Sequence, residues 1–79
     1  MGFRLQVASD VRRDGLGLEL LNDSGEVVAE VFRRDANNSL EVSLFDSGLP
    51  FVEVEPLFRI ARTELGAFED GTALPAPLT

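Results

Sequence analysis

The chain has 79 residues and a net charge of −7, and it contains no cysteine, histidine, tryptophan or tyrosine. This composition excludes disulfides, thiolate zinc sites and the histidine that serves most often as a general base near neutral pH. All seven basic residues are arginines, so lysine chemistry is also absent. The acidic balance disfavours contact with phosphate backbones or anionic membranes, and we expect neither nucleic acid nor a membrane as a partner.

The first two segments with strand character occupy residues 3–9 and 16–22. Phe3, Leu5 and Val7 alternate with polar or small residues in the first, as in a half-buried strand. Asp14 and Gly15 form a turn signal between them.

Two further strands are predicted at residues 26–34 and 40–45. The motif NDSG at 22–25 precedes the third strand, and DANNS at 35–39 precedes the fourth. Both motifs are rich in residues that form tight turns. Short links between successive strands predict an antiparallel meander.

Residues 50–66 favour a helix. Pro56 argues against one, because an interior proline removes a hydrogen bond, but a start near Val52 or Glu53 places it in or just past the first turn. Gly66 suits the C-cap. The alternative for residues 50–54 is a fifth strand. Apolar residues recur at helical spacing and predict one buried stripe: Phe51, Val54, Phe58, Ala61 and Leu65.

These elements predict an α+β fold in which a four-stranded antiparallel β-meander is packed on one face by a single C-terminal α-helix, in two layers. Residues 1–66 form the single domain. Residues 67–79 contain two prolines and little periodicity, and we expect a mobile or loosely docked tail.

The third strand is apolar on both faces, and two arguments about its orientation conflict. Burial favours Ala29 and Val31 beneath the helix, because the opposite choice would bury Glu30 without a partner. The DSG turn favours a three-residue loop that pairs Leu20 with Val28, which reverses the faces, whereas a two-residue loop pairs Leu20 with Val27. We adopt the burial argument, with these residues inward: Val27, Ala29 and Val31.

This choice predicts an apolar patch on the sheet face away from the helix. The expected cover is the chain's own tail, a second copy of the chain or another protein. In the matching register Phe32 pairs with Ser43, which brings its ring near Phe45. The candidate interface residues are Leu21, Val28, Phe32 and Phe45.

The sequence gives only weak signals for a catalytic or metal-binding site. The segment 35–46 faintly resembles a calcium-binding loop, with Asp35 and Asp46 at ligand-like positions, but Leu40 replaces the required glycine. The serines lack an activating base. We therefore assign no catalytic, metal or cofactor-binding residues and expect no enzymatic activity.

The sequence favours a small acidic, non-catalytic protein-interaction module that forms a homodimer through the outer sheet face or binds an unidentified protein. The alternative is an accessory or regulatory subunit that binds a larger basic partner through its carboxylates. No window is apolar for long enough to predict a signal peptide or a membrane span, so we expect a cytoplasmic protein.

Overall fold

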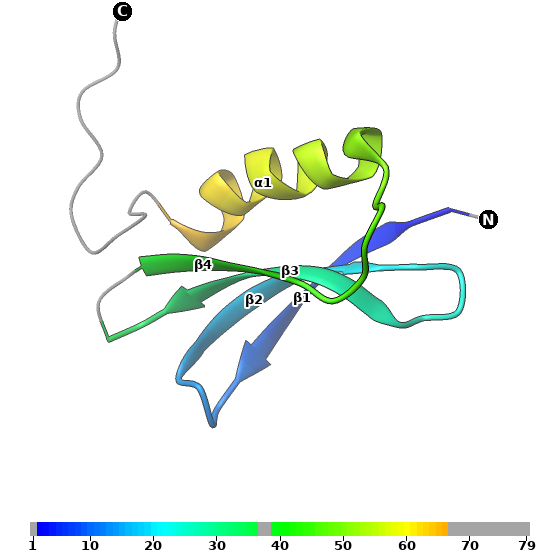
Figure 1. The fold of residues 1–79 in the computed structure, drawn as a ribbon. Helices are drawn as coiled ribbons and strands as arrows, with labels where there is room; N and C mark the ends of the chain where they lie inside the picture. The colour runs from blue at the N-terminus through cyan, green and yellow to red at the C-terminus, as the bar shows by residue number, and fades with distance from the viewer. Residues whose placement is uncertain (1, 37–38, 67–79) are drawn as a thin grey trace, which may run out of the picture.

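The computed structural model describes residues 2–36 and 39–66. The strands form one antiparallel sheet in the order β1-β2-β3-β4, and the helix lies across one of its faces (Figure 1). This arrangement confirms the predicted two-layer α+β fold. The predicted tail at 67–79 lies outside the described residues. The elements are β1 Arg4–Asp10, β2 Gly15–Leu21, β3 Val27–Arg34, β4 Ser39–Leu44 and α1 Phe51–Leu65.

The core lies between α1 and the two central strands. Leu57, Ala61 and Leu65 recur at four-residue steps, so they form one stripe along the helix that faces the sheet. Their partners come from alternate positions of β2 and β3, as expected for strands that turn one face toward a helix. The buried cluster consists of Leu18, Leu20, Val28, Ala29, Val31, Leu57, Ala61 and Leu65.

The predicted helical stripe is partly wrong. Ala61 and Leu65 are buried as expected, but Leu57 takes the central position and is fully buried. Phe51 and Phe58, which the prediction placed in the core, are exposed. The apolar positions of α1 extend around more of the helix than two strands can cover, so burial selects the residues above β2 and β3 and leaves the aromatic rings at the flank.

The helix begins at Phe51, earlier than expected, so residues 50–54 are a helix start rather than a fifth strand. The carbonyl oxygen of Pro50 accepts the first hydrogen bonds, and Pro56 lies inside the helix. At the other end, Arg33 Nη1 on β3 donates to the carbonyl oxygen of Leu65 at 3.1 Å. Gly66 follows as the predicted C-cap, with φ of 116°. The arginine satisfies a carbonyl that the helix leaves unpaired and ties α1 to the sheet.

The turn between β2 and β3 has the three-residue loop that the turn residues favoured, not the two-residue loop that belongs to the adopted register. The N–H of Asn22 donates to the carbonyl oxygen of Glu26 at 3.0 Å, and Gly25 has φ of 82°. The side chain of Asn22 accepts hydrogen bonds from the N–H groups of Ser24 and Glu26. These local hydrogen bonds hold the turn independently of the core.

A β-bulge follows this turn and resolves the conflict between turn chemistry and burial. Leu21 lies opposite Val27 but Leu20 lies opposite Ala29, so Val28 is an extra residue in β3. Both registers predicted for Leu20 are therefore wrong. The extra residue shifts the pairing by one, which places Ala29 under the helix as burial requires.

The bulge also changes the surroundings of the two valines. Val27 was predicted to face the helix but is half-buried opposite Leu21. Val28 was predicted to lie on the outer face but belongs to the buried core cluster. A bulge redirects the side chains beside it, which a strictly alternating pattern cannot anticipate.

We expect Leu57→Ala to unfold most of the protein. Leu57 has 0% exposure, and such a truncation costs about 2–5 kcal/mol, whereas a domain of this size rarely has more than about 3–5 kcal/mol in total. Val52→Ala is the matched control, because Val52 is an exposed residue of the same helix. Urea denaturation followed by circular dichroism measures both. Equal midpoints for the two variants would contradict the placement of Leu57 in the core.

Candidate interaction surfaces

The outer sheet face is built around Phe32, which lies against the glycines of β2. Phe32 pairs directly with Gly17. A Cβ atom added to Gly17 would lie 3.4 Å from Phe32 Cδ1, and one added to Gly15 would lie 2.6 Å from Phe32 Cζ. The two positions therefore lack side chains where the aromatic ring needs the space.

Arg13, from the turn between β1 and β2, covers this ring. Its guanidinium carbon lies 3.9 Å from the centre of the Phe32 ring. Nη1 and Nη2 donate to the two carboxylate oxygens of Glu30 at 3.0 and 2.8 Å, and Nε donates to Asp10 at 2.7 Å. The planar guanidinium thus stacks on the ring and binds a carboxylate with two parallel hydrogen bonds.

The turn that carries Arg13 is fixed by Asp10. One carboxylate oxygen of Asp10 accepts the backbone N–H groups of Arg12 and Arg13, at 3.0 and 3.1 Å. The side-chain hydrogen bond from Arg13, followed by its backbone hydrogen bond, lowers the pKa of Asp10. Asp10 is thus held as the carboxylate that orients the turn.

The burial argument placed Glu30 on the sheet face away from the helix. Its side chain is nevertheless buried there. Its side chain is 5% exposed, against 40% for that of Arg13. The hydrogen bond to Glu30, followed by that to Asp10, raises the pKa of Arg13, so the arginine stays charged. Glu30 tolerates burial because both of its oxygens accept hydrogen bonds from a cation.

This arrangement changes the predicted interface. Phe32 is 2% exposed, and Leu21 and Val28 are also buried, so these three residues form no exposed apolar patch. Phe45 is 61% exposed. Phe32 pairs with Glu41 on β4, not with Ser43, so the predicted register was wrong by two residues. The structure contains a single chain, and contact of a partner with these four residues stays a prediction.

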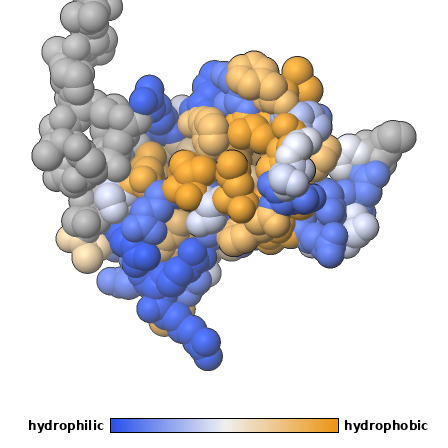
Figure 2. Space-filling model, viewed as in Figure 1, coloured by the Kyte–Doolittle hydropathy of each residue, from blue (hydrophilic) through white to orange (hydrophobic). Residues whose placement is uncertain are grey.

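A different apolar surface lies on the helix side of the sheet, between α1 and β4. There the structure has an open groove of about 580 Å³. Hydrophobic side chains gather between the helix and the sheet (Figure 2). The residues that line the groove are Val31, Leu40, Val42, Phe51, Val54, Glu55, Phe58, Arg59, Ala61 and Arg62.

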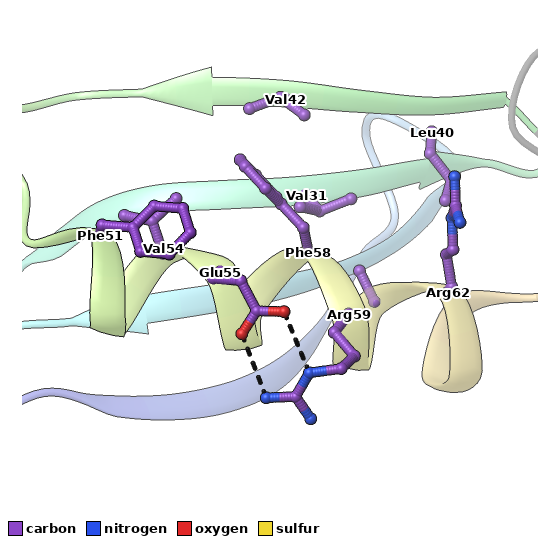
Figure 3. Close-up of a pocket in the computed structure, with 10 residues that line it drawn as sticks. Val31, Leu40, Val42, Phe51, Val54, Glu55, Phe58, Arg59 and Arg62 are labelled. Atoms are coloured by element: carbon purple, nitrogen blue, oxygen red, sulfur yellow. Dashed lines mark hydrogen bonds and ion pairs between the residues drawn. The ribbon is translucent and has the colours of Figure 1, made fainter.

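The groove exists because α1 packs on β2 and β3 and leaves the inner face of β4 open. Val42 pairs with Val31 and so faces the helix side, yet it is 54% exposed. From the helix, Phe51 and Phe58 point toward β4 (Figure 3). Glu55 and Arg59, ion-paired at 3.2 Å, lie on the side of α1 away from β4 (Figure 3). Arg62 extends from α1 toward Leu40 (Figure 3), and the other side chains between the two walls are aliphatic and aromatic, which suits apolar contact rather than acid–base chemistry.

The segment that resembles a calcium loop has another structure. Asp35 accepts a hydrogen bond from Arg33 at 3.0 Å, and β4 begins at Ser39. Across the described residues, no three acidic side chains are grouped so that they could hold a metal ion.

Within residues 2–36 and 39–66, no helix has the length and apolar character needed to cross a membrane. In comparisons with known proteins, no family model matches the chain, and no curated protein or solved structure matches it significantly.

The contact of Arg13 with Glu30 leads to a prediction about stability. We expect Arg13→Ala to destabilise the fold by about 3 kcal/mol, because it leaves a buried carboxylate without its cation and uncovers Phe32. Adding Glu30→Gln should recover part of this loss, since the neutral amide costs less to bury. Urea denaturation of the two single variants and the double variant measures the coupling. Additive effects would show that the two side chains act independently.

The close approach at Gly15 leads to a second prediction. A Cβ atom there would lie 2.0 Å from the carbonyl oxygen of Arg33, and because that oxygen belongs to the backbone of a central strand, we expect Gly15→Ala to prevent folding. Gly25→Ala is the control. A Cβ atom at Gly25 meets nothing within 4 Å, so the expected cost is only the strain of positive φ, roughly 1 kcal/mol. Two-dimensional NMR spectra would contradict the prediction if Gly15→Ala kept dispersed amide signals.

Proposed function

We propose that this domain is a non-catalytic protein-interaction module that binds its partner along the groove between α1 and β4. One observation carries the proposal, the collection of large apolar side chains that remain exposed along this groove. Contiguous apolar surface on a small acidic domain is costly in water and often marks a contact site. The exposed apolar residues that line it are Val42, Phe51 and Phe58.

The edge of β4 supports the same surface. Among the described residues no strand pairs with β4 beyond β3, because the sheet order ends there. An edge strand presents unpaired backbone N–H and C=O groups that can bind an added strand. A partner strand would therefore gain main-chain hydrogen bonds from the edge and apolar contacts from the groove, as in recognition by strand addition.

The proposal keeps the interaction role expected from the sequence and moves its surface to the helix side. The outer face offers less apolar area, because Arg13 covers Phe32. The alternative, a regulatory subunit that binds a basic partner, has less support, since several carboxylates form ion pairs with the chain's own arginines. These are Asp10, Glu30, Asp35, Glu41 and Glu55. The cytoplasmic location stays a prediction.

A photo-crosslinking amino acid at position 42 tests the proposed surface in living cells of the native host. We expect covalent products that contain a protein bound at this position. The matched control is position 7, because Val7 is 51% exposed and lies on the helix side of the other edge strand, β1. Equal products from both positions, or none from position 42, would contradict a binding role for the groove.

A further inference from the structure

We infer that the groove binds a second copy of this chain, through antiparallel pairing of β4 with β4 of the partner copy about a twofold axis at Val42. This inference rests on the proposed function and names the partner. The resulting dimer would contain one continuous eight-stranded sheet, with both helices on the same face.

The direction of the backbone groups on β4 limits the pairings that are possible. The N–H of Phe45 donates to the carbonyl oxygen of Val28 on β3 at 2.9 Å. Because hydrogen-bonded and non-hydrogen-bonded positions alternate in an antiparallel pair, Ser43 and Glu41 also direct their groups toward β3. The N–H and C=O groups that remain for the outer edge belong to Leu40, Val42 and Leu44.

A twofold axis at Val42 pairs all of these groups. Val42 lies opposite its own copy, and Leu40 lies opposite Leu44 of the partner subunit. The pairs that exchange hydrogen bonds in such a ladder are those whose groups point outward, so every edge-facing N–H meets a C=O. A shift of the register by one residue would set Leu40, Val42 and Leu44 opposite residues whose N–H and C=O groups point toward β3. The outward-facing groups of β4 would then remain unpaired.

The side chains are self-complementary in the same register. Leu40, Val42 and Leu44 all lie on the helix side, as shown by their pairing with Arg33, Val31 and Ala29. Apolar side chains therefore meet apolar side chains across the axis. On the other face, Glu41 lies opposite Ser43 of the partner subunit, so the pairing opposes no like charges directly.

The symmetry also closes the groove. Adjacent antiparallel strands related by a twofold axis perpendicular to the sheet keep equivalent faces on the same side. Because α1 runs beside β4 (Figure 3), the axis brings the groove of one copy next to the groove of the other. Phe51 and Phe58 of each copy would then cover the row of side chains at the centre of the new sheet.

The proposed contact extends along the edge strand and the helix. β4 has six residues and so offers a contact about 20 Å long, and the fifteen residues of α1 extend over about 22 Å. Phe51 is 77% exposed, and a fully covered aromatic side chain buries about 150–250 Å². A standard interface buries roughly 800 Å² per partner, to which the edge strand and both flanks of the groove would contribute.

Charge gives the dimer a distinctive dependence on salt. Each copy carries a net charge of −7, so association brings like charges together and should strengthen as salt screens them. On α1 and β4, Glu55 and Glu41 are paired with Arg59 and Arg34. Binding of a basic partner through the carboxylates would show the opposite dependence and weaken with salt.

Sedimentation equilibrium of the full chain tests the inference. We expect a mass twice the 8.6 kDa of one chain at about 100 µM protein, well above a micromolar Kd, and a larger dimer fraction at high salt. Val42→Asp should yield a folded monomer, because it places two like charges at the axis. Val7→Asp, a change of the same kind on the opposite edge of the sheet, should leave the dimer intact.

Crosslinking tests the register without depending on these variants. The chain has no cysteine, so Val42→Cys introduces a single thiol that should form a disulfide-linked dimer on mild oxidation, since paired strand positions lie within the required distance. Val7→Cys should form no disulfide-linked dimer under the same conditions.

A monomeric mass for the unmodified chain, together with no disulfide from Val42→Cys, would overturn the inference. If position 42 nevertheless crosslinked to a different protein in cells, the interaction role would stand and only the identity of the partner would be wrong. A dimer that resisted Val42→Asp but was lost on Phe45→Ser would place the contact on the outer face, which also overturns it.

Discussion

The extra residue in β3 is the constraint on which the two faces of this sheet depend. The turn at 22–25 is stabilised by its own hydrogen bonds, and in a regular ladder it would direct Glu30 toward the helix. The bulge at Val28 changes the alternation by one position after the turn. Local turn chemistry and burial of the aliphatic face are thereby satisfied together, although a regular strand would satisfy only one of them.

Much of the fold could be predicted from alternation, turn residues and helical spacing, because these features act locally. The four strands, the helix and the C-cap at Gly66 were all recognisable, and the three-residue loop was one of two alternatives. The bulge could not be recognised, because it arises where the register that the turn sets conflicts with the register that burial of the core needs. The contact of Arg13 with Phe32 joins residues far apart in sequence, and the glycines at 15 and 17 opposite an aromatic strand were its available signal.

The two faces differ in how their apolar residues are covered. On the outer face, the long side chain of Arg13 spans both the ring of Phe32 and the carboxylate of Glu30. On the helix side, α1 lies above the middle of the sheet and its aromatic residues extend past it. The candidate site could not be predicted from the sequence, because it depends on the position of the helix over the sheet and not on any motif.

The guanidinium of Arg13 is one part of a four-residue arrangement with Gly17, Glu30 and Phe32. Lysine carries the same charge, but it lacks the planar guanidinium and its paired N–H donors. It could therefore not replace the arginine in both of its contacts. A side chain in place of the glycine would displace the carboxylate, and loss of the carboxylate would remove both hydrogen bonds from Nη1 and Nη2 of the arginine. Among homologous chains these four positions should therefore covary, and a change at one should be accompanied by compensating changes at the others.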